Sequence, residues 1–374
     1  MLIPEGSPAV TVPSAFNVGE LHIGTLTNGN GVVAIEFQHK ATNTVSGLIA
    51  IYRGSTLTHK GLTGGMKTLA TAAYGLVLAA KGDLSVCEGA QLTVTGVGFF
   101  NALGPGASGT TAGDPGAGHA SRNNASSLAK GNTYGSILAP TSWGSGGAKP
   151  GGGVIRLMAQ GVMTVDGVIE ADTSHFKNSG TGGSVWLTCA TLEGNGSITA
   201  NGGSWSTGVN AGSGGRIALV ETEADDFSDF AGTVQAECLV TADGFSGEAG
   251  RAGAGTVYWK ANGVDELRVG NTAAASASLT DFPMADDGDS QNAFRGTTLV
   301  GEKNMTFFLT ADTTVFDLDL RESTAKINLN GHTLKILSRE HKKGRRWGDS
   351  YENLVIENGG RIEWQTLGLS VIVK

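Results

Sequence analysis

The stretch that decides the fold is Gly151-Gly152-Gly153-Val154-Ile155-Arg156-Leu157-Met158-Ala159, a run of glycines followed by a short apolar strand. Similar stretches begin at Gly182, at Gly214 and, more weakly, at Gly253. The equivalent apolar positions in the four copies, at separations of 30, 32 and 40 residues, are Ile155, Val185, Ile217 and Val257. Such self-similarity is typical of repeat architectures, in which each repeat packs on the next.

Each copy contains two short strands, separated by a break and followed by a glycine-rich turn, and the apolar period is two almost throughout. About 30 residues per repeat suits one coil of a parallel β-helix with an extended loop, whereas a propeller blade needs ~40–45. The sequence therefore predicts an all-β solenoid of stacked parallel strands.

The pattern divides the chain into four parts. Residues 1–100 are expected to form N-terminal coils, because Leu76 and Leu78 align with Ile155 and Leu157 at a constant offset of 79. Residues 101–153 interrupt the alternation and contain fourteen glycines. The clearest repeats occupy 154–260, and 261–374 continue with shorter spacing. The apolar alternation weakens between 261 and 296. Residues 261–374 could therefore continue the solenoid, which is the preferred interpretation, or form a separate β subdomain.

The glycine-rich segment 101–153 is predicted to be a loop insertion at one corner of the solenoid. Insertions in repeat proteins often form the binding face. The alternative is a coil that packs on the core without a ligand.

Composition and charge limit the partners. The formal net charge of −8 and the isoelectric point near 5.4 argue against nucleic-acid binding, which needs a basic face. The basic run 341–347 is expected to be a solvated loop, or else a contact for an anion or acidic sugar. The sequence contains no run of 18 apolar residues, so no membrane span is expected. The start, Met-Leu-Ile-Pro-Glu-Gly, does not resemble a signal peptide.

Cys189 and Cys238 have the parity of inward-facing strand residues. We expect both to be small buried core residues, since three cysteines without paired spacing suggest neither a disulfide framework nor a metal site.

The glycine-rich repeats resemble those of bacterial surface and autotransporter-type proteins. The segment Ile327-Asn328-Leu329-Asn330-Gly331-His332-Thr333-Leu334 is similar to a rung of pectate-lyase-like β-helices. The resemblance covers roughly residues 75–260 and 315–340. It implies a right-handed parallel β-helix solenoid with a glycine-rich loop insertion, in a protein that is secreted or held at the cell surface. It says little about function, because the fold carries adhesins, lyases, glycosidases and tailspikes.

Strand parity singles out a row of outward-facing residues. Because successive side chains alternate, Arg156, Trp186 and Tyr258, with Ala218 between the last two, should form a column on one outer face. Aromatic and guanidinium planes on a flat sheet suit sugar rings, so these three residues are the predicted carbohydrate contacts. The alternative is that the insertion covers Trp186, which then only packs.

Two acidic clusters are candidate calcium sites. Asp286, Asp287 and Asp289 form the stronger one, and 221–229 the weaker one. Neither matches a known calcium loop, and acidic turns are usually just solvated. Apart from this possible Ca²⁺, no cofactor is expected.

The sequence thus predicts a structural, adhesive or carbohydrate-binding role, with a polysaccharide or a cell-surface glycan as partner. The alternative is a polysaccharide lyase or glycoside hydrolase, which would need a groove lined by clustered carboxylates and basic residues. Asp317 and Asp319 have a suitable spacing, but their alternation with apolar residues is that of an ordinary outer strand face.

Overall fold

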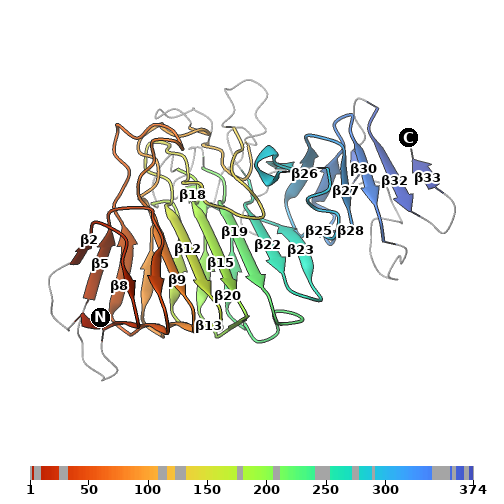
Figure 1. Ribbon diagram of the computed structural model, residues 1–374. Coiled ribbons are helices and arrows are strands. Elements are labelled where there is room, and N and C mark those ends of the chain that lie inside the picture. The colour runs from red at the N-terminus through yellow and green to blue at the C-terminus, as the bar shows by residue number, and fades with distance from the viewer. Residues whose placement is uncertain are drawn as a thin grey trace.

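The computed structural model describes residues 2–3, 10–24, 33–107, 116–122, 132–174, 180–204, 211–240, 253–271, 278–288, 291–338, 354–355, 359–365 and 370–373. These residues form short β-strands joined by turns and coil, with the 3-10 helix η1 (Ala285–Asp287) as the helical element of the described part (Figure 1). In the same residues, no helix is long and apolar enough to cross a membrane.

Three parallel sheets build the first unit, the described residues up to Lys260. Sheet A consists of β1 (Leu2–Ile3), β4 (Leu21–Ile23), β7 (Ile49–Ile51), β10 (Leu84–Val86), β13 (Val162–Val165) and β16 (Thr191–Glu193). Sheet B consists of β2 (Val10–Val12), β5 (Val33–Phe37), β8 (Ser55–His59), β11 (Gln91–Thr93), β14 (Val168–Glu170), β17 (Ser197–Thr199) and β20 (Thr233–Gln235).

Sheet C is longer and runs on into the second unit, the described residues from Asp265 onward. Its strands in the first unit are β3 (Asn17–Val18), β6 (Asn43–Val45), β9 (Leu76–Ala80), β12 (Val154–Ala159), β15 (Ser184–Cys189), β19 (Arg216–Glu221) and β22 (Thr256–Lys260). Its strands in the second unit are β23 (Asp265–Val269), β25 (Thr298–Gly301) and β28 (Asp317–Leu320). Through most of the first unit each strand pairs with the third one after it, an arrangement consistent with a β-solenoid.

Two further parallel-strand sheets complete the second unit. Sheet D contains β24 (Ser278–Phe282), β26 (Met305–Leu309), β29 (Ala325–Asn328) and β31 (Leu354–Val355). Sheet E contains β27 (Thr313–Val315), β30 (Thr333–Ile336), β32 (Arg361–Gln365) and, antiparallel to β32, β33 (Ser370–Val373). A small pair, β18 (Gly202–Ser204) and β21 (Cys238–Val240), lies beside the first unit's coils.

The register of sheet C confirms the repeat alignment. Ile155 pairs with Leu76 on one side and with Val185 on the other, and Ile217 lies between Val185 and Val257. In sheet A the same offset of 79 residues brings Leu84 opposite Met163. The apolar period therefore fixes both the strands and their neighbours.

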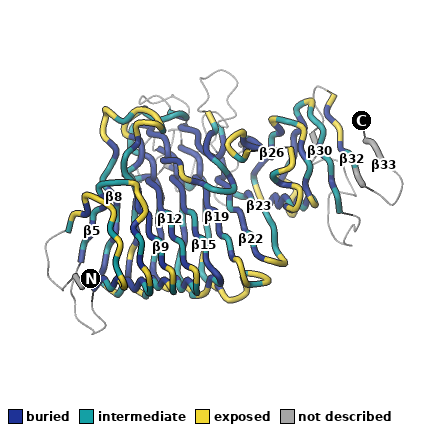
Figure 2. Tube along the Cα trace, in the orientation of Figure 1, coloured by how far each residue is buried: buried dark blue, intermediate teal, exposed yellow. Residues whose placement is uncertain are grey.

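The first hydrophobic core lies on the inward faces of these sheets. Ile155, Val185 and Ile217 are fully buried in it, and Cys189 is buried with them, as its parity predicts. Cys238, on β21, is also buried, so this expectation is confirmed too. Figure 2 shows buried and half-buried residues along the strands of the first unit, and exposed residues gathered in the turns. Because the inward-facing side chains of successive paired strands contact one another, they form one continuous apolar interior.

The glycines of the repeat are needed where coils approach closely. A Cβ built on Gly152 would lie 1.9 Å from the carbonyl oxygen of Ala171, and one on Gly182 would lie 2.1 Å from that of Ala200. Both oxygens belong to backbone, which cannot move aside, so a side chain would push the stacked coils apart.

A second hydrophobic core begins where the chain reverses direction. β23 runs antiparallel to β22, and Tyr258 lies opposite Leu267, which is followed across the sheet by Leu299 and Leu318. All four are buried in the second core, whereas Trp259, next to Tyr258, belongs to the first. Because neighbouring side chains point to opposite faces, the two cores lie on opposite faces of sheet C. Strands β23, β25 and β28 therefore share a sheet with the central repeats, and their buried leucines belong to the second core.

Candidate functional site

The predicted outer row is in register, but it is not uniformly exposed. Arg156 pairs with Trp186, Trp186 with Ala218, and Ala218 with Tyr258. Arg156 and Trp186 are half-buried, whereas Ala218 is fully buried and Tyr258 is 7% exposed. Tyr258 therefore lies in the second core and is not available to a glycan. Parity alone predicts an open outer column, which is wrong for Tyr258. Arg156 and Trp186 are the members of the column that remain partly exposed.

The insertion covers much of this face. Ile137 belongs to the second core, and Leu138 and Trp186 pack against it. Beside the outer row, the hydroxyl of Ser184 donates a 2.7 Å hydrogen bond to the carbonyl oxygen of Ser142. This arrangement matches the alternative in which the insertion covers Trp186.

Arg216 holds the insertion against sheet C. Its guanidinium is fully buried and donates from Nε to the carbonyl oxygen of Tyr134 at 3.0 Å and from Nη2 to that of His119 at 3.4 Å. Its Nη1 donates to the hydroxyl of Thr256 at 3.3 Å. Burial lowers the pKa of Arg216 to about 10, although the negative charge of Asp287 opposes the shift. The sequence offered one signal for this residue, an arginine at an outward position next to the glycine-rich turn.

The described members of the predicted calcium cluster bind the insertion. Asp286 accepts a hydrogen bond from the amide of Gly135 at 2.9 Å. The Oδ1 atom of Asp287 accepts from the amides of Ile137 at 2.9 Å and Leu138 at 3.2 Å, and from the hydroxyl of Ser136. Asp289 lies outside the described residues. Within the described part of the chain, no three His, Cys, Asp or Glu side chains are grouped to hold a metal ion. Asp286 and Asp287 therefore anchor the insertion to the second unit.

A groove lies on the outer face of sheet C, at the edge of the insertion. Its volume is about 340 Å³. The groove is lined by Lys40, Thr42, Leu69, Gly75, Val77, Thr141, Ser142, Trp143, Val154 and Arg156. The indole of Trp143 is fixed by a 2.7 Å hydrogen bond to the carbonyl oxygen of Tyr74. Lys40 donates to the carbonyl oxygen of Ala72 at 2.8 Å, and its Nζ lies 5.7 Å from the centre of the Trp143 ring.

Arg156 connects this groove to the outer row. Its guanidinium carbon lies 4.0 Å from the centre of the Trp186 ring, so one face of the guanidinium stacks on the indole. Its Nε is buried and makes no hydrogen bond. Burial lowers the pKa of Arg156 below its usual value. None of the described residues that line the groove is a carboxylate.

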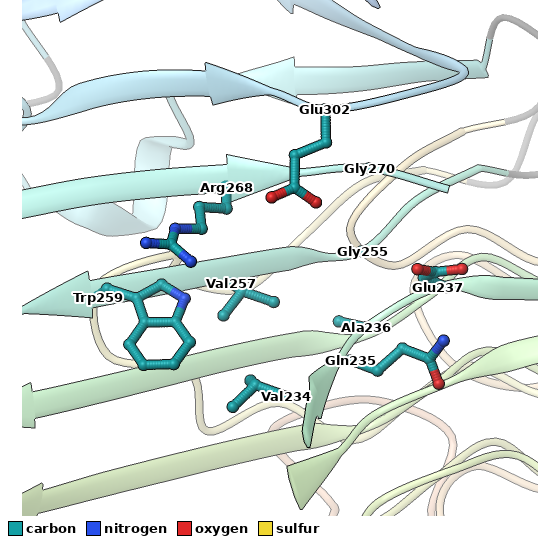
Figure 3. Close-up of a pocket in the computed structure, with 10 residues that line it drawn as sticks. All are labelled: Val234, Gln235, Ala236, Glu237, Gly255, Val257, Trp259, Arg268, Gly270 and Glu302. Carbon is teal, nitrogen blue, oxygen red and sulfur yellow. The ribbon is translucent and has the colours of Figure 1, made fainter. Parts of the chain in front are cut away.

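A second, smaller pocket lies where sheet B ends at β20, beside the start of the second unit (Figure 3). Its volume is about 80 Å³. It is lined by Val234, Gln235, Ala236, Glu237, Gly255, Val257, Trp259, Arg268, Gly270 and Glu302. Arg268 stacks 5.0 Å from the centre of the Trp259 ring and donates to Glu266 at 2.8 Å.

The two pockets differ in how their arginines are compensated. Arg268 has a carboxylate within hydrogen-bonding distance, whereas Arg156 has none among the described residues. The groove is therefore the candidate site. Parity predicted Arg156, but Lys40 and Trp143 come from coil segments that no periodic pattern connects to it.

Comparisons of the chain with protein-family models, with curated proteins and with solved structures found no match.

Proposed function

We propose that this chain is a secreted or surface-displayed right-handed parallel β-helix that binds carbohydrate in the groove beside Arg156. The fold part of the proposal is supported by the parallel sheets in constant register, since crossover connections between parallel strands are almost always right-handed. The resemblance of the glycine-rich repeats to bacterial surface proteins supports the location.

The observation that carries the binding role is the composition of the groove. It combines the half-buried guanidinium of Arg156 over the Trp186 indole with the exposed side chains of Lys40, Thr42 and Thr141, whereas the indole of Trp143 is buried. Hydroxyl groups and cations offer hydrogen bonds to sugar hydroxyls, and the half-buried Leu69 suits the C–H face of a pyranose.

A single site of this kind should bind weakly, with a dissociation constant in the millimolar to micromolar range, or about 4–8 kcal/mol. Several copies displayed on one surface would raise the overall affinity without any new contact. This suits an adhesive or structural role better than capture of a free sugar.

The test is binding of the full chain to an array of neutral and acidic oligosaccharides. Thr42→Tyr, which places a ring at the exposed rim of the groove, should abolish the signal. Thr58→Tyr, at a half-buried outward position of sheet B, is the matched control and should bind like the wild type. Absence of binding to every glycan, or equal binding by both variants, would refute the proposal. Release of new reducing ends or unsaturated products would instead support the lyase or hydrolase alternative.

A further inference from the structure

We propose that the groove recognises an anionic group of its saccharide, a carboxylate or a sulfate, through Arg156 and Lys40. This inference rests on the proposed carbohydrate-binding function and names the class of sugar. It starts from a charge that the described residues leave uncompensated.

The two cations of the groove have no carboxylate partner in the described structure. Arg156 stacks on Trp186 and makes no ion pair there, and Lys40 donates to a backbone carbonyl. By contrast, Arg268 in the second pocket pairs with Glu266 at 2.8 Å, and Arg361 pairs with Glu363 at 3.0 Å. The groove therefore has two positive charges within a chain of net charge −8.

Burial makes this uncompensated charge significant. A guanidinium that has lost part of its hydration is stabilised by an anion. The Nε of Arg156 is buried, so its Nη groups are the donors that a ligand in the groove can reach. A carboxylate or sulfate has the oxygens to accept from such a donor, whereas a sugar hydroxyl carries no charge. Because Trp186 holds one face of the guanidinium, its edge is left as the part that can donate to a ligand.

The position of Lys40 supports the same conclusion. Arg156 and Lys40 both line the groove, where Arg156 is half-buried and Lys40 is exposed. A sugar ring bound in the groove would have its charged substituent near these two cations. Arg156 and Lys40 would therefore discriminate between sugars by the charge and by the ring position of the anionic substituent.

The experiment compares glucose, glucuronate and glucose 6-sulfate, which differ only at one carbon, with acetate and sulfate ions alone. Ligand-observed NMR on the full chain measures each affinity. We expect glucuronate or glucose 6-sulfate to bind about tenfold or more tightly than glucose. The preference should decline as salt rises from about 0.01 M to about 1 M, because the Debye length falls from about 30 to about 3 Å.

Variants assign the preference to the groove. Arg156→Met keeps an apolar stem over Trp186 and should bring the ratio of glucuronate to glucose affinity close to one, whereas Arg156→Lys should keep part of it. Lys335→Met, on the outer face of sheet E, removes a remote charge and should leave the ratio unchanged.

The outcomes separate this inference from the proposed function. Equal, salt-independent binding of glucose and the two acidic sugars would overturn the inference and leave carbohydrate binding in place. Binding of acetate or sulfate as tight as that of the acidic sugars would support the anion site and overturn the role of the sugar ring. No binding by any of these probes would overturn the inference, and the glycan array then tests the proposed function separately.

Discussion

The guanidinium carbon of Arg156 lies 4.0 Å from the centre of the Trp186 ring, across directly paired positions of β12 and β15. Trp186 also packs against the second core, together with Leu138 of the insertion. The indole thus joins the first unit, the insertion and the candidate groove, and its role in packing can be measured separately from binding.

Trp186→Ala should lower the free energy of unfolding by about 2–4 kcal/mol, because it removes a large half-buried ring from between the sheet and the insertion. Urea denaturation measures the loss. Thr188→Ala, two residues along the same strand and also half-buried, is the control and should cost under about 0.5 kcal/mol. Equal midpoints for the two variants would mean that Trp186 lies free on the surface.

Ile217 is buried in the first core and Ala218 in the second, so substitutions at these neighbouring positions test whether each face of sheet C carries a core. Ile217→Ala should cost about 2–5 kcal/mol by opening a cavity in the first core. Ala218→Leu should cost about 1–3 kcal/mol by overpacking the second core, where Ala218 is fully buried. Thermal or urea unfolding of both variants is the measurement, with Val220→Ala at a half-buried position of the same strand as the milder reference. A neutral Ala218→Leu variant would show that the second unit does not cover this strand.

Arg216→Met should destabilise the chain by about 3–5 kcal/mol, since it leaves two buried carbonyl groups without donors and the charge of Asp287 uncompensated. Limited proteolysis should then cut the insertion earlier than in the wild type. Arg361→Met, which removes a half-exposed arginine from the second unit, should change neither readout appreciably. If both variants are cleaved at the wild-type rate, Arg216 does not hold the insertion.

Asp172 predicts a dependence of stability on pH. Burial raises its pKa from 3.8 to about 7, although it accepts a 2.6 Å hydrogen bond from the amide of Asn201. The folded chain then binds more protons at Asp172 than the unfolded chain between these values, so the contribution of Asp172 to stability is greatest at or below about pH 4 and is lost as pH rises through about 7. Asp172→Asn keeps an acceptor for Asn201 and removes the titration.

Unfolding in urea at a series of pH values, for the wild type and Asp172→Asn, isolates this contribution as the difference between the two curves. A difference that does not change between pH 4 and about pH 7 would place the Asp172 pKa at its ordinary value in the folded chain.

The strand repeat and its register follow from the amino-acid sequence alone. Apolar alternation around Ile155, Val185 and Ile217, with glycines at the corners, is a local pattern that repeats at a nearly constant spacing. Stacked coils can satisfy it in only one way, because a slip of one residue would turn every apolar side chain outward. For the same reason the burial of Cys189 and the alignment of Arg156 with Trp186 could be predicted.

Tertiary structure decided which parts of the outer face stay open. Strand parity separates the two faces of sheet C, but it does not say what packs on either one. The antiparallel step at β22 and β23 places a second core over Tyr258. Asp287 and Arg216 hold the insertion in place through contacts across 150 and 82 residues of sequence. Lys40 and Trp143, which line the groove together with Arg156, lie in coil without periodicity, so the groove exists only in the folded chain.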